Sequence, residues 1–173
     1  MSLSSSKIAK MGISIALAIA FKWVLLQVPN VEPISFVVFS SGYILGAIEG
    51  GVVGLLTMLV YSVFNPYGMA PLPVLIAQVI SMAFIGLTGG VVAKLTWFSK
   101  ANTTLKFLAI GAIGLVLTLI YDILTNLAVA YMAGQLMPIL IGGIVFSLIH
   151  IISNAIIFTV LSPAIFRVKL VLK

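Results

Sequence analysis

The sequence predicts an all-α membrane protein, a bundle of six transmembrane helices formed by one domain, 1–173, with both termini in the cytoplasm. Three observations lead to this prediction. Hydrophobic residues make up 62% of the chain and charged residues 7%, whereas about a quarter of the residues in soluble domains are charged. Helix breakers and polar clusters divide the apolar sequence into six segments. The basic residues gather in segments that would share one side of the membrane.

The six expected spans occupy almost the whole chain, because crossing a hydrocarbon layer of about 30 Å takes about 20 apolar residues. The first apolar run continues to about Gln27 with no small-residue cleavage site at its end. We therefore interpret it as a retained helix and not as a cleaved signal peptide. The spans are expected at 7–27, 34–48, 50–64, 72–95, 104–131 and 137–163.

The second and third spans are short, because about 15 residues of helix extend only roughly 22 Å. The alternative is one tilted helix across both segments. The charges favour two helices, since five spans would place the N-terminus and the basic 94–106 loop on opposite faces. With six spans, the cytoplasmic side receives Lys7, Lys10, Lys94, Lys100, Lys106, Arg167, Lys169 and Lys173. The reversal is expected at Glu49-Gly50-Gly51, because glycine permits a tight turn.

The polar side chains inside the expected spans lie mainly in the outer half, and in lipid each must find a partner or face a cavity. Helical spacing aligns them into two stripes, formed by Thr118, Asp122 and Asn126 and by Ser147, His150 and Asn154. If the stripes face each other, they create an outward-opening polar pocket. The candidate substrate-binding residues are Lys22, Glu32, Asn65, Tyr67, Gln78, Asp122, Asn126 and His150.

Each charged candidate also has a simpler interpretation. Lys22 is close enough to its helix end to extend to the lipid headgroups, and Glu32 can be a solvated loop residue. Asp122 lies about 13 Å from the outer end, too deep to reach water, so it either binds ligand or pairs with Lys22. His150 is either a hydrogen-bonded core residue or a ligand contact. Lys22 would suit a carboxylate ligand, whereas Asp122 and Glu32 would suit an amine or a cationic ring, so the sequence leaves the substrate open.

A strip of small residues follows one face of the first span, formed by Ala9, Gly12, Ala16 and Ala20. Such strips let a second helix approach closely. Because Lys22 lies on the opposite face, the strip is expected to point outward, which makes Gly12, Ala16 and Ala20 candidate partner-docking residues. A glycine series at Gly42, Gly46, Gly50 and Gly54 is interpreted as packing within the bundle.

Several kinds of chemistry have no motif in this sequence. It contains no G-x-x-x-x-G-K-[ST] loop, so we expect no ATP site of its own. No hydrolase motif, catalytic residue, metal site or cofactor is predicted. The basic residues are too few and too scattered for nucleic acid. One functional alternative is a self-sufficient small-solute transporter or channel, which includes a proton-coupled transporter acting through Asp122 and His150. This alternative is expected to be oligomeric, with the glycine series as its interface. An intramembrane enzyme is the third.

The chain resembles the S components of energy-coupling factor (ECF) transporters, the small substrate-binding subunits of vitamin importers. The resemblance rests on six expected helices with cytoplasmic ends, Ala16 and Ala20 on the first helix, Asn30-Val31-Glu32-Pro33-Ile34, and the stretch 121–127. It implies a plasma-membrane protein that captures a vitamin-like micronutrient under the loops that contain Glu32 and 65–67. It also implies a membrane coupling subunit docked at Ala16 and Ala20, and two cytoplasmic ATPase subunits that bind the ATP.

Overall fold

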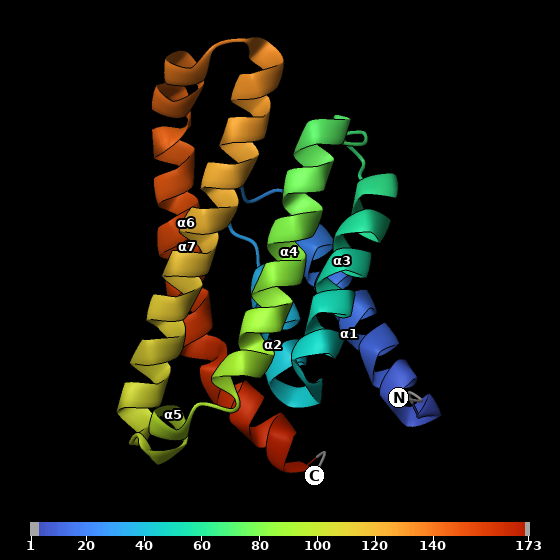
Figure 1. The fold of residues 1–173 in the computed structure, drawn as a ribbon, viewed down its shortest axis with the longest axis vertical. Coiled ribbons are helices and arrows are strands. Elements are labelled where there is room, and N and C mark those ends of the chain that lie inside the picture. The colour runs from blue at the N-terminus through green and yellow to red at the C-terminus, as the bar shows by residue number, and fades with distance from the viewer. Residues whose placement is uncertain (1–3, 172–173) are drawn as a thin grey trace.

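The computed structural model describes residues 4–171, and within that range the regular structure is entirely helical. Its helices are α1 (Ser5–Val24), α2 (Ile34–Leu45), α3 (Ala47–Val63), α4 (Leu72–Val92), α5 (Thr96–Lys100), α6 (Thr103–Ala133) and α7 (Leu136–Val171). A helix covers most of each of the six apolar segments, and α5 is a short additional helix in the 94–106 loop (Figure 1).

Three helices, α4, α6 and α7, are long and apolar enough to cross a bilayer. Their outward faces carry large apolar side chains, such as Ile80, Val145 and Val160, which are 58%, 64% and 65% exposed. An apolar surface of this extent is typical of contact with lipid and not with water. α1 carries three lysines, and α2 and α3 have only 12 and 17 residues. The described residues therefore form an all-helical bundle with three candidate membrane-spanning helices, which suggests a membrane protein, and six crossings stay a prediction.

Helix α2 lies at the centre of the bundle, where it packs against α1, α3, α4 and α7. Most of its residues are buried, from Ile34 at its start to Tyr43 in its last turn. The rings of Phe36 and Phe39 each lie 5.4 Å, centroid to centroid, from the ring of Phe158 on α7. Aromatic contacts of this kind fix the helices that surround the central one.

The chain reverses between α2 and α3 at Gly46, so the prediction of a turn at Glu49-Gly50-Gly51 is wrong. Gly46 has a φ of 125°, a conformation that residues with a side chain rarely adopt. The three predicted turn residues are instead helical and buried near the start of α3. The separation into two helices was predicted correctly, since α3 packs back against α2 and no helix runs through both segments.

Glycines at the junction of α2, α3 and α4 serve close packing. A side chain at Gly42 or Gly50 would overlap the backbone of Gly86 on α4, and one at Gly54 would overlap the backbone of Met82. The helices therefore approach backbone to backbone, which small residues permit in membranes. The interpretation of the glycine series as internal packing is confirmed for these positions, so the series is not exposed for contact with a second copy.

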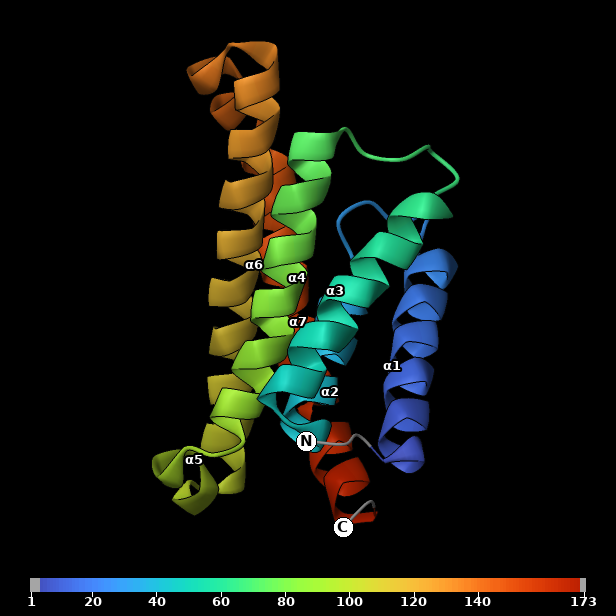
Figure 2. The same ribbon diagram turned by 45° about the vertical axis from the view of Figure 1, so that its right-hand side comes forward.

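Both ends of the described chain lie at the same end of the bundle as α5, whereas the α3–α4 and α6–α7 connections lie at the other (Figures 1 and 2). The basic residues follow this division, because they occupy the first turns of α1 and α6, the segment around α5 and the last turns of α7. They are Lys7, Lys10, Lys94, Lys100, Lys106, Arg167 and Lys169. Lys173 lies outside the described residues. Lys22, near the opposite end of α1, is the exception.

Candidate functional site

A polar cavity of about 380 Å³ lies between the helices in the half of the bundle away from the basic end. Helices α1, α2, α3, α4, α6 and α7 and the two loops at 25–33 and 64–71 contribute to its wall. Seven of the eight predicted substrate-binding residues line it, which are Lys22, Glu32, Asn65, Gln78, Asp122, Asn126 and His150. Pockets of this size suit small molecules.

Tyr67, the eighth predicted residue, does not line the cavity and is 74% exposed. The cause is the local turn of the α3–α4 loop. The Asn65 side chain accepts a hydrogen bond from the Tyr67 backbone N–H at 3.0 Å, and the Gly68 N–H donates to the Asn65 carbonyl at 2.9 Å. Gly68 has a φ of 91°, so the loop turns tightly there and leaves the Tyr67 side chain in the open.

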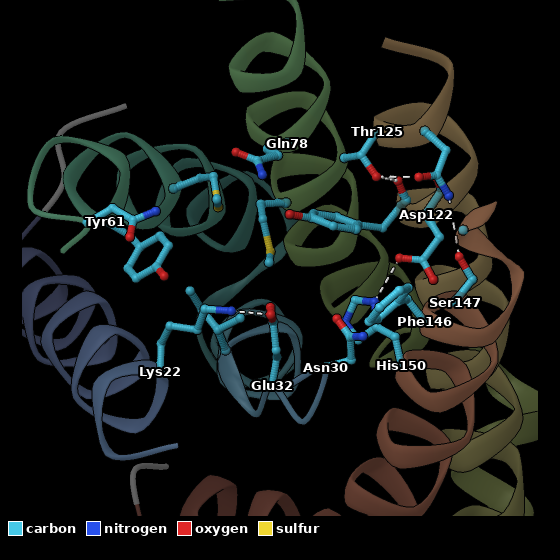
Figure 3. Close-up of a pocket in the computed structure, with 17 residues that line it drawn as sticks. Lys22, Asn30, Glu32, Tyr61, Gln78, Asp122, Thr125, Phe146, Ser147 and His150 are labelled. Atoms are coloured by element: carbon cyan, nitrogen blue, oxygen red, sulfur yellow. Dashed lines mark hydrogen bonds and ion pairs between the residues drawn. The ribbon is translucent and has the colours of Figure 1, made fainter. Parts of the chain in front are cut away.

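Lys22 and Glu32 form an ion pair on one side of the cavity (Figure 3). Both side chains are largely buried, at 16% and 20% exposure, and the Lys22 ammonium also lies 5.5 Å from the centre of the Tyr61 ring. The suggested pairing of Lys22 with Asp122 is therefore wrong, because Glu32 takes that place. Since Glu32 follows α1 by only eight residues, its loop can reach Lys22 without rearranging the bundle.

Asp122 and His150 form a second pair on the opposite side of the cavity (Figure 3). The His150 Nδ1 lies 2.7 Å from the Asp122 Oδ1, and the Asn126 side-chain amide donates to the Ser147 hydroxyl at 3.3 Å. Both contacts join α6 to α7. The polar stripes predicted on these helices do face each other, and they do so at the cavity.

The Asp122–His150 pair keeps unused hydrogen-bonding capacity. Asp122 is 8% exposed and His150 6%, and neither the Asp122 Oδ2 nor the His150 Nε2 has a hydrogen-bond partner among the described residues. Buried polar atoms are normally paired, since leaving one unpaired costs about 1–3 kcal/mol. Both side chains line the cavity, so a polar ligand that reaches these two atoms would supply the missing partners.

Several cavity residues were not among the predicted ones, notably Asn30, Tyr61, Thr125 and Phe146. Asn30 had a sequence signal, because it precedes Glu32 in the loop that carries the resemblance. The Ser153 hydroxyl on α7 donates to the Asn30 carbonyl at 2.7 Å, which holds this loop against the bundle. Tyr61 and Phe146 have aromatic side chains, which are also common on lipid-facing surfaces. Helical spacing alone therefore could not assign them to the cavity.

The small-residue strip on α1 points away from the bundle. Ala9, Gly12, Ala16 and Ala20 are all exposed, whereas Ala18 on the opposite face is completely buried. A side chain added at Gly12 would meet no atom within 4 Å. These four positions of α1 are therefore accessible in the described part of the chain.

Comparison of the chain with protein-family models, curated proteins and solved structures gave no match. The cavity residues themselves therefore carry the functional interpretation. Among the described residues, no group of three His, Cys, Asp or Glu side chains is placed to hold a metal ion. What the arrangement offers is a partly enclosed wall of amides, hydroxyls, aromatic rings and two charged pairs, which suits recognition of a small polar molecule.

Proposed function

We propose that this protein captures a vitamin-like micronutrient from outside the cell, as the substrate-binding S component of an ECF-type importer in the plasma membrane. The observation that carries the proposal is the polar cavity, which brings seven residues from distant parts of the chain to one place. In lipid such a group is costly unless it has a partner or a function. ATP would be bound and hydrolysed by partner subunits.

With six crossings and a cytoplasmic N-terminus, the cavity would face the exterior. Both ends of the described chain and the basic residues occupy the other end of the bundle (Figure 2), and basic residues favour the cytoplasm. The 12 residues of α2 are too short to cross alone. However, α2 is buried within the protein, and the loop before it lines the cavity. Irregular backbone at membrane depth is tolerated where protein covers it or where it faces a cavity.

The exposed strip on α1 supports the proposed partnership with a membrane coupling subunit. It lets a partner helix approach at Gly12, Ala16 and Ala20. Lys22 lies on the same helix but lines the cavity. One helix would thus contact the ligand on one face and the coupling subunit on the other.

The alternative function is a self-sufficient transporter or channel for a small solute. Its proton-coupled form has one observation in its favour, which is the contact between Asp122 and His150. Against the channel, the glycine series that would serve as its oligomer interface is packed inside the bundle. We therefore favour the capture function.

Native mass spectrometry of the detergent-purified protein tests the proposed function. We expect a monomer that carries one bound small molecule, because a cavity with unpaired buried atoms gains hydrogen bonds when it is filled. The molecule should be released when the protein unfolds and should rebind at a ratio of one to one. In liposomes, the protein alone should not accumulate this molecule.

Two results would contradict the proposal. One is a purified protein that neither carries nor rebinds any small molecule. The other is a protein that moves the solute across liposome membranes without a partner or ATP, because that activity belongs to the alternative function.

A further inference from the structure

The cavity wall contains two charged pairs that differ in their cation. In one pair a lysine neutralises the carboxylate, and in the other the carboxylate contacts a histidine ring. Lys22 is the one lysine or arginine in the described cavity wall, and Glu32 neutralises it. Asp122 contacts no lysine or arginine, and its ionic partner within residues 4–171 is the His150 ring. Each cationic or potentially cationic side chain in the described cavity wall is therefore already paired with a carboxylate, Lys22 with Glu32 and the His150 ring with Asp122.

A ligand carboxylate would therefore bind at a cost. To reach Lys22 it would displace Glu32, and this would leave a largely buried carboxylate without its partner. Breaking a buried pair is strongly unfavourable for this reason. At the other side of the cavity, a ligand carboxylate would meet the carboxylate of Asp122 and be repelled.

A ligand with N–H donors meets the opposite situation at the Asp122–His150 pair. The Asp122 Oδ2 is an acceptor with no partner among the described residues. If the His150 Nδ1 carries the proton that it shares with the Asp122 Oδ1, the Nε2 of the neutral ring is also an acceptor. An N–H group on the ligand would give either acceptor its missing partner, and a positive charge on that group strengthens the hydrogen bond.

The remaining wall suits a flat ring. Tyr61, Tyr121 and Phe146 present aromatic side chains to the cavity, and Met58 and Met82 also line it. The Tyr121 ring packs edge-on against His150, with 5.9 Å between centroids. The volume of about 380 Å³ lies in the range of pockets that hold small molecules.

We propose that the cavity binds a planar nitrogen-containing ring system that presents a cationic or N–H-rich edge to Asp122 and His150, and that it discriminates against carboxylate ligands. This inference rests on the proposed capture function, and it names the chemical class of the substrate.

Three probes of nearly equal size and shape test the inference, namely benzamidine, benzamide and benzoate, which are cationic, neutral and anionic. Their dissociation constants would be measured by equilibrium dialysis against the full-length protein after removal of any co-purified molecule. We expect benzamidine to bind at least about tenfold more tightly than benzoate, with benzamide between them. This ranking is obtained on the wild type and needs no variant. Any molecule that co-purifies should contain a basic or N–H-rich ring.

Asp122→Asn should lower the affinity for benzamidine about tenfold or more and reduce the discrimination against benzoate. The matched control is Glu49→Gln, which removes an acidic side chain that pairs with Lys7 and does not line the cavity. It should leave all three affinities unchanged.

The possible outcomes separate this inference from the proposed function. Preference for benzoate, or a co-purified carboxylate without a basic ring, would overturn the inference and leave the capture function in place. Equal affinities for benzamidine in the wild type and Asp122→Asn would overturn the assignment to Asp122. Failure of every probe, together with the absence of any co-purified molecule, would overturn both.

Discussion

Gly86→Ala is expected to destabilise the bundle severely, although it adds only one methyl group. The new Cβ would overlap the Gly50 carbonyl on α3, and the nearest neighbours at this position are backbone atoms that cannot rotate away. Overpacking in a close-packed interior typically costs about 1–3 kcal/mol and occasionally more. Because the contact joins α3 to α4, we expect a low yield of folded protein and a clear drop in the temperature of thermal unfolding.

Gly142→Ala is the matched control, because an added Cβ there meets no atom within 4 Å. Both glycines lie within helices, so the effect of alanine on helix propensity, up to about 1 kcal/mol in favour of the helix, applies to both. The difference between the two variants measures the close helix approach alone. Equal stabilities would show that α3 and α4 do not meet at Gly86.

Ala16→Leu is expected to abolish most energised uptake without changing ligand binding. Ala16 is exposed in the small-residue strip of α1 and does not line the cavity. A leucine would hold a partner helix away from α1, and overpacking by about 1–3 kcal/mol weakens a complex by a factor of about 5 to about 150. The measurements are ligand affinity of the purified subunit and uptake by cells that contain the whole importer.

Ala112→Leu is the matched control, because it adds the same bulk at an exposed position on α6. It should preserve both binding and uptake. Normal uptake by Ala16→Leu would show that the strip is not a docking surface. Loss of ligand binding by the same variant would show that α1 acts through the cavity and not through a partner.

The positions of the helices and the polar stripes could be predicted from the sequence, because each depends on local information. In the sequence, a membrane span is visible as a run of apolar residues. A polar stripe is visible as polar residues three or four positions apart in one helix. These rules put Asp122 and Asn126 on one polar stripe and Ser147 and His150 on another, and in the structure the two stripes face each other. They also predict that Ala16 and Ala20 face outward.

The errors and omissions concern features that depend on which segments meet. The reversal falls at Gly46 because Gly50 is required for packing against α4, and a single sequence does not reveal which glycine has which role. The partner of Lys22 depends on the path of the loop before α2, which places Glu32 nearer than Asp122. Tyr67 turns outward because of hydrogen bonds within its own loop.

In the proposed topology the cavity end of the bundle faces the outside of the cell, and cysteine labelling tests this orientation most directly. The chain contains no cysteine, so a single cysteine can be introduced at Tyr67 in the α3–α4 loop or at Ser99 in α5, both of which are exposed. A membrane-impermeant maleimide should label Tyr67→Cys in intact cells and Ser99→Cys only after the membrane is permeabilised. Labelling of Ser99→Cys in intact cells, with Tyr67→Cys protected, would turn the cavity towards the cytoplasm and contradict capture from outside.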